Sequence, residues 1–286
     1  MKAYTLGLYE KSMPPNLGWR EKLMYTKQAG FDFLEISIDE TDEKLKRLDM
    51  TQEERAGLLS ITNGIDLPIR TMCLSGHRKY PIGSMDDSIA ARGMEIMEKA
   101  IRLAEDLGIR IIQLAGYDVY YEESTKETKE RFAGNLKKAA EMAAGAGVVL
   151  GFETMETEFM NTVEKAMHYV NQVNSSYLNV YPDLGNITNA AYTYETSVEE
   201  DLETGRGHLS AMHLKETIPG VFREVPFGTG HVDFERGIKK AWELGIRKYV
   251  TEFWYTGNET WKDDLSYASQ MMREILNRQV KERQVA

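Results

Sequence analysis

The sequence contains a single cysteine, Cys73, which lies between the apolar residues Met72 and Leu74. One cysteine cannot form a disulfide within the chain, and it cannot build a metal site from several thiolates. We therefore expect Cys73 to be a buried, reduced thiol.

Long apolar runs are also absent. No segment approaches the roughly 18 consecutive apolar residues that a membrane-spanning helix requires, and the first residues lead directly into a strand-like segment. From these absences we expect a cytoplasmic protein that does not interact with a membrane.

Basic residues are outnumbered by acidic ones. The chain has 35 lysines and arginines against 45 aspartates and glutamates, so its formal net charge is −10 at pH 7. Nucleic-acid binding depends on clustered basic residues that neutralise phosphates. A nucleic-acid partner is therefore not expected.

The remaining composition is that of an ordinary globular protein. Of the 286 residues, 42% are apolar and 28% are charged, which suffices for one large core. The length also lies in the range of a single closed α/β barrel. We expect one domain over residues 1–286.

A repeated pattern predicts the strands. A glycine is followed by a short run of β-branched or aromatic residues and then by a polar residue, at positions 30–35, 108–113, 147–153 and 245–252. The glycine suits the left-handed turn that follows a helix, and the run has the length and composition of a strand. Variants of this pattern bring the predicted strands to eight, at 5–9, 68–74, 178–183 and 209–215.

Segments with helical periodicity separate these strands. Two of them begin with the sequence of a capping box, at 51–54 and 124–127. Alternating strands and helices predict a parallel sheet. We favour a (β/α)8 TIM barrel over an open sheet, because no G-x-G-x-x-G or P-loop motif follows an early strand and the eight units are evenly spread. In a barrel, the irregular segments that follow strands lie at the catalytic face, at 75–84, 117–123 and 217–230.

Four polar residues stand at or near the ends of the later predicted strands: Glu153, Asp183, His213 and Glu252. Parallel strands deliver them to one rim of the barrel, where two glutamates, an aspartate and a histidine can share one divalent metal ion. Zn, Mn, Co and Mg all suit this mixture of oxygen and nitrogen ligands. Any one of the four is equally well explained by an ion pair or a cap, but four at corresponding positions favour a metal site.

Other residues are candidates for substrate binding. His77, in a turn after the third strand, can contact substrate oxygens, although an exposed loop histidine is an equal alternative. Lys215 and Arg223 flank the seventh loop and can bind a substrate phosphate, although surface bases usually remain solvated. Gln113 and Glu35 stand where predicted strands end and can line the pocket.

A substrate phosphate is also expected near the loops after the seventh and eighth strands, as is common in barrels. The backbone amides around Gly228 and Gly230 are the predicted donors. The remaining histidines are interpreted as structural, because one lies in a helical segment and two lie in predicted loops: His168, His208 and His231. Helices outside a barrel can support a homodimer, but the sequence identifies no interface.

Motifs surround the four candidate ligands and occur in two earlier loops. They read GFETME at 151–156, YPDLGN at 181–186, MHLKET at 212–217, PFGTG at 226–230, VTEFW at 250–254, LSGHR at 74–78 and QLAGYDVYY at 113–121. Together they resemble the xylose-isomerase-like barrel superfamily. More closely, they resemble the L-ribulose-5-phosphate (L-xylulose-5-phosphate) 3-epimerases of bacterial ascorbate and pentose use, often labelled hexulose-6-phosphate isomerases. The resemblance covers nearly the whole chain.

This resemblance implies that Glu153, Asp183, His213 and Glu252 bind one divalent metal, and that Glu153 and Glu252 also form the acid–base pair. The implied substrate is a small phosphorylated ketose that is inverted at carbon 3. The proton on that carbon becomes removable only when the resulting enediolate is stabilised, which a metal can do. A base on each face of the planar intermediate then lets the proton leave one side and return on the other.

Three other functions remain open on the sequence. An aldose–ketose isomerase acting on a sugar phosphate or on hydroxypyruvate can use the same metal and carboxylates. An abasic-site endonuclease of the same barrel type needs several more histidines for its three-zinc cluster and a basic surface, which five histidines and a charge of −10 disfavour. A non-catalytic sugar-binding barrel does not need a base on each face.

Overall fold

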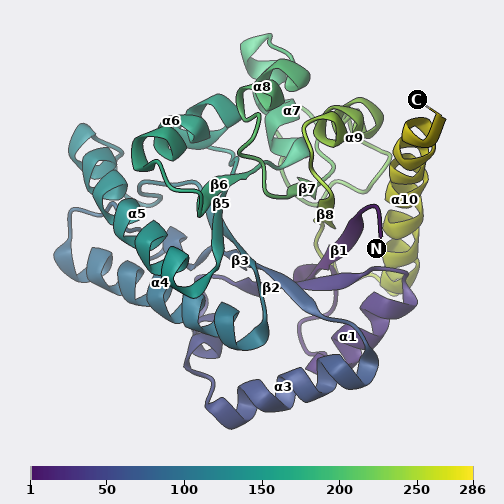
Figure 1. Ribbon diagram of the computed structural model, residues 1–286, viewed down its shortest axis with the longest axis horizontal. Helices are drawn as coiled ribbons and strands as arrows, with labels where there is room; N and C mark the ends of the chain where they lie inside the picture. The colour runs from purple at the N-terminus through teal and green to yellow at the C-terminus, as the bar shows by residue number, and fades with distance from the viewer. Residues whose placement is uncertain (1, 286) are drawn as a thin grey trace.

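The computed structural model describes residues 2–285, in which eight parallel strands form a central ring with helices around it (Figure 1). The strands follow one another in the order β6-β5-β4-β3-β2-β1-β8-β7. Their bounds are β1 Thr5–Tyr9, β2 Phe33–Ile38, β3 Ile69–Leu74, β4 Ile111–Ala115, β5 Val149–Glu153, β6 Leu178–Tyr181, β7 Met212–Leu214 and β8 Lys248–Thr251.

The ring closes between β6 and β7. No continuous ladder joins these two short strands, but single parallel bridges pair Val180 with Leu209 and Asp183 with His213. The backbone amide of His213 also donates to the carbonyl of Pro182 at 2.9 Å. The predicted (β/α)8 barrel is therefore confirmed, with its weakest seam next to two of the candidate metal ligands.

Helices follow the strands along the chain and cover the outside of the ring (Figure 1). None of the helices in the part of the chain that the structure describes is long and apolar enough to cross a membrane. The α-helices are α1 Trp19–Gln28, α2 Asp42–Leu45, α3 Gln52–Ile65, α4 Asp87–Leu107, α5 Lys126–Ala146, α6 Val163–Val173, α7 Leu184–Tyr194, α8 Val198–Thr204, α9 Phe234–Glu243 and α10 Trp261–Val285.

Most of the helix ends that the sequence predicts are found in the structure. Gly108 and Gly147 take the left-handed conformation after α4 and α5, with φ of 70° and 65°, so each strand starts two or three residues after its glycine. The capping box at Thr51 is confirmed. The one predicted at 124–127 is wrong by one position: Thr125 caps α5, because the hydroxyl of Ser124 donates instead to Asp118.

Side chains of the strands alternate between the helices and the inside of the ring. The larger apolar core lies between strands and helices, and a smaller cluster includes Tyr9, Phe33, Cys73 and Tyr181. Cys73 is buried and unpaired, as expected. Glu35 and other polar residues are buried at inward positions too, so the interior is polar towards the carboxyl ends of the strands.

Candidate metal and active site

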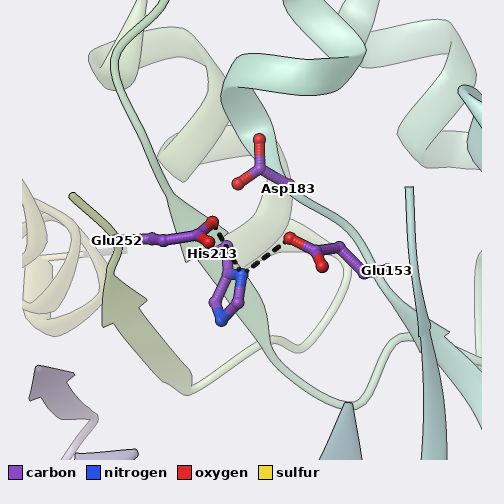
Figure 2. A group of neighbouring side chains, drawn as sticks. All are labelled: Glu153, Asp183, His213 and Glu252. Carbon is purple, nitrogen blue, oxygen red and sulfur yellow. Dashed lines mark hydrogen bonds and ion pairs between the residues drawn. The ribbon is translucent and has the colours of Figure 1, made fainter. Parts of the chain in front are cut away.

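Four buried side chains converge at the carboxyl ends of the later strands (Figure 2). Glu153 is the last residue of β5, Asp183 caps α7 just after β6, His213 is the middle residue of β7 and Glu252 directly follows β8. Each offers one ligand atom, and these atoms all lie within 4.8 Å of one another. The fold thus places the four predicted ligands around one point.

His213 lies between carboxylates on both sides of its ring. Nδ1 is 3.0 Å from Glu153 Oε1 and 3.1 Å from Glu252 Oε2. Nε2 is 2.6 Å from Glu35 Oε1. Burial alone would lower the pKa of His213, but the negative charges of Glu35 and Glu252 outweigh it and raise this pKa well above its usual value. The position of Nδ1 therefore attracts a positive charge.

Asp183 has one oxygen occupied and one free of hydrogen bonds. Oδ1 accepts a hydrogen bond from the backbone amide of Asn186 at 2.6 Å, and this bond caps the N-terminus of helix α7. Oδ2 is buried without a hydrogen-bond partner and lies 3.3 Å from the ammonium nitrogen of Lys215. Burial and the nearby carboxylates of Glu252 and Glu153 raise the pKa of Asp183 to about 8, against the attraction of Lys215.

The two glutamates approach the cluster from opposite sides, as Figure 2 shows. Glu153 Oε2 accepts from the side-chain amide of Gln113, which leaves Oε1 directed at His213. Burial and the charge of Glu252 raise the pKa of Glu153. Burial also acts to raise the pKa of Glu252, but Lys215 and His213 overcome it and lower this pKa. The two carboxyl groups therefore differ in their environments.

The cluster fits a divalent cation. Three buried carboxyl groups at this separation repel one another, and each loses hydration that the protein does not fully replace. Asp183 Oδ2 and Glu252 Oε2 both lack a hydrogen-bond donor. Carboxylate oxygens with one imidazole nitrogen form a donor set that suits Zn, Mn, Co or Mg.

A small cavity adjoins the cluster. Its lining residues include Glu153, Lys215, Glu252 and Trp254. Its other lining residues include three further bases: Lys11, Arg78 and Arg223. A molecule bound there would thus contact both candidate metal ligands and positive charges.

Of the residues predicted to bind substrate, Arg223 and Lys215 line the cavity and Gln113 does not. Arg223 lines the cavity and pairs with Glu156 at 3.3 Å. Lys215 also lines it, but its ammonium is held among the carboxylates, 3.6 Å from Glu252 Oε2. Gln113 is buried and does not line the cavity, and its side-chain amide donates to Glu153.

The structure does not bring His77 or Gly228 to the cavity. His77 is only 4% exposed, and its Nε2 lies 3.0 Å from the carbonyl of Gly93. Burial lowers its pKa to about 4, although the contact with Gly93 acts in the opposite direction. Its neighbour Arg78 lines the cavity instead. The amide of Gly228 already donates to Glu216 Oε2 at 3.0 Å.

Sequence reasoning also missed the role of two residues. Glu35 was expected at the end of a strand, but β2 continues to Ile38 and Glu35 contacts His213 from within the barrel. Its alternation with Phe33 and Ser37 was the available signal for an inward position. Arg78 had no such signal, because the 3-10 turn Gly76–Arg78 decides which side chain faces the cavity.

Comparisons with known proteins agree with this architecture. Residues 23–275 match the family described as xylose isomerase-like TIM barrel. The chain is 46% identical over 256 residues to L-ribulose-5-phosphate 3-epimerase UlaE of Escherichia coli O157:H7, with 88% of each chain covered. It is also similar to the solved structure of an L-ribulose 3-epimerase, at 20% identity and a TM-score of 0.78 over 99% of this chain and 97% of the other.

A second solved structure is D-psicose 3-epimerase from Clostridium cellulolyticum H10 with D-tagatose, at 17% identity and a TM-score of 0.81 over 95% of this chain and 99% of the other. At these identities the two solved structures support the fold alone. The family match and the 46% identity extend over most of the chain. The chain therefore belongs to the xylose isomerase-like TIM-barrel family.

Proposed function

We propose that the protein is a metal-dependent 3-epimerase that interconverts L-ribulose 5-phosphate and L-xylulose 5-phosphate through an enediolate. The observation that carries this proposal is the pair Glu153 and Glu252, which reach one candidate metal site from opposite sides. The relative at 46% identity is named as an L-ribulose-5-phosphate 3-epimerase, and this supports the choice of sugar.

Glu153, Asp183, His213 and Glu252 would hold the ion, which supplies Lewis-acid stabilisation of negative charge on substrate oxygens when it is bound. The two glutamates have the second task of moving the proton. One carboxylate removes it from carbon 3, and the other carboxylic acid returns a proton to the opposite face. Because Glu153 and Glu252 are buried, access of water to the intermediate is limited.

Arg78 and Arg223 are the bases best placed for the phosphate of the substrate. The guanidinium of Arg78 is stacked at 4.8 Å over the ring of Tyr120, and its Nε is buried without a hydrogen-bond partner. Arg223 lies on the cavity wall near Trp254, 5.8 Å from the ring centre. Arginine forks bind phosphate oxygens in pairs. Lys215 is already committed to the carboxylates, so we no longer assign it to the phosphate.

Replacing Arg78 with Met is expected to raise KM for L-ribulose 5-phosphate by about 10-fold or more, because a hydrogen bond to a charged group contributes roughly 1.5–3 kcal/mol. Any activity on unphosphorylated L-ribulose should change much less. Lys79→Met is the matched control, since Lys79 is the exposed neighbour of Arg78 and does not line the cavity. Equal losses on the two sugars would argue against a phosphate contact.

The nearest alternative is an aldose–ketose isomerase that uses the same metal and carboxylates. NMR analysis of the product formed from L-ribulose 5-phosphate distinguishes the two: L-xylulose 5-phosphate supports the proposal, and an aldose phosphate contradicts it. The abasic-site endonuclease loses support, since the one metal-ligand group found among the side chains of residues 2–281 contains a single histidine.

Phosphorylated sugars cross membranes poorly because they are charged, so we place this activity in the cytoplasm.

A further inference from the structure

Glu35 is a fully buried carboxylate in the middle of β2, on the far side of His213 from the candidate metal position. Its Oε1 lies 2.6 Å from His213 Nε2, and its Oε2 accepts from the hydroxyl of Tyr181 at 3.0 Å. These contacts cross the inside of the barrel, since β2 is separated from β7 by β1 and β8. Both oxygens of Glu35 are thus occupied by other inward-facing side chains.

This arrangement decides which nitrogen of His213 carries the proton. An ionised carboxylate can only accept hydrogen bonds, so Glu35 requires a proton on Nε2. When a metal binds, Nδ1 must be the nitrogen that keeps its lone pair, and it faces Glu153 and Glu252 at 3.0 and 3.1 Å. Without Glu35, those same two carboxylates would be the nearest acceptors and would favour a proton on Nδ1. A protonated Nδ1 cannot bind a metal.

We propose that Glu35 is a positioning residue that fixes the tautomer and orientation of His213 and strengthens it as a metal ligand, while Tyr181 holds the second oxygen of Glu35. A carboxylate behind a metal-binding imidazole acts in this way in other metal sites. The inference rests on the metal site of the proposed function, but not on the identity of the sugar or on the reaction.

Two substitutions distinguish the role of Glu35 as a hydrogen-bond acceptor from the role of its negative charge. Glu35→Gln keeps an oxygen that can accept from Nε2, whereas Glu35→Leu removes it. Thr71→Val is the control, because Thr71 is the β3 partner of Glu35, is equally buried, and has a hydroxyl without a hydrogen-bond partner. Metal affinity is measured by titrating Co²⁺ into each metal-free protein against a competing chelator, with circular dichroism as a check of folding.

We expect Glu35→Leu to bind Co²⁺ about 10–100-fold more weakly than the native protein, Glu35→Gln to lose less, and Thr71→Val to bind normally. Histidine ¹⁵N spectra of the Zn²⁺-loaded proteins should place the proton of His213 on Nε2 in the native protein and in Glu35→Gln. If Glu35→Leu does not fold, Glu35→Gln decides the question: Co²⁺ binding at least a few-fold weaker than that of the native protein supports the proposal, and native affinity overturns it. Native affinity in both Glu35 variants, or a native tautomer with the proton on Nδ1, would overturn it.

The Co²⁺ affinities of the Glu35 variants do not depend on which sugar the protein uses. A native protein that binds Co²⁺ but forms no epimer would contradict the proposed function, and the Glu35 comparison would still decide this inference. A native protein that binds no divalent metal would overturn both.

Discussion

Replacing Asp183 with Asn is expected to lower kcat/KM by at least about 10³-fold, because the metal would supply several kcal/mol of stabilisation to the transition state. The asparagine oxygen can still accept from the amide of Asn186, so the cap of α7 is preserved. What is lost is the negative charge of Oδ2, the oxygen that has no hydrogen-bond donor in the structure. Metal content and turnover are measured together on the same sample.

Asp233→Asn is the matched control for this substitution. Asp233 caps α9 by accepting from the amide of Arg236 at 3.0 Å, and it is not part of the metal-ligand group. Its variant should retain metal and activity. Chelation of the native protein should reproduce the loss seen in Asp183→Asn, and added divalent metal should restore activity only to the native protein. An Asp183→Asn variant with full activity would contradict the assignment of the site.

Replacing Glu153 or Glu252 with Gln is expected to reduce epimerisation by about 10²–10⁴-fold, since each change removes a group that transfers protons. The amide keeps the shape of the side chain and an oxygen that can contact the metal, so metal content must be measured in parallel. A metal-loaded variant should still exchange the carbon 3 proton of one epimer with solvent. It should no longer interconvert the two epimers, because abstraction on one face survives while delivery on the other is lost.

Glu158→Gln serves as the control for the glutamate variants. Glu158 lies in the segment after β5, the strand that ends at Glu153, is exposed, and does not line the cavity. It should behave as the native protein does. Unchanged turnover in both Glu153→Gln and Glu252→Gln would rule out the two-base mechanism.

The barrel and the four converging residues could be predicted because both depend on local patterns. Strand length, the glycine after each helix and the polar residue at the strand end recur along the chain, and parallel strands must deliver their ends to one rim. His213 illustrates the limit of this reasoning. Its strand, β7, is only three residues long, and only single bridges connect its segment to the β6 segment. Its exact register therefore depends on tertiary contacts that the sequence pattern does not contain.

Arg223 lines the cavity as the sequence suggested, but most of the surroundings of the site could not be predicted, because they depend on contacts between distant elements. His77 and Arg78 are adjacent in sequence, yet they lie in different environments. The ring of His77 contacts the backbone carbonyl of Gly93 in α4, whereas the guanidinium of Arg78 stacks over the ring of Tyr120. Lys215 lies two positions after His213 in the sequence but far from Glu252, and it reaches the carboxylates because the barrel brings β7 and β8 together. Glu216 likewise occupies the amide of Gly228 that was expected to bind phosphate.

The most direct test of the central claim is the position of deuterium after the metal-loaded protein acts on L-ribulose 5-phosphate in D₂O. A 3-epimerase with a base on each face must exchange the carbon 3 proton each time it inverts that carbon. We predict one deuterium at carbon 3 of the L-xylulose 5-phosphate that forms, and no deuterium at carbon 1. Label at carbon 1 with formation of an aldose phosphate, or product without any deuterium, would contradict the account.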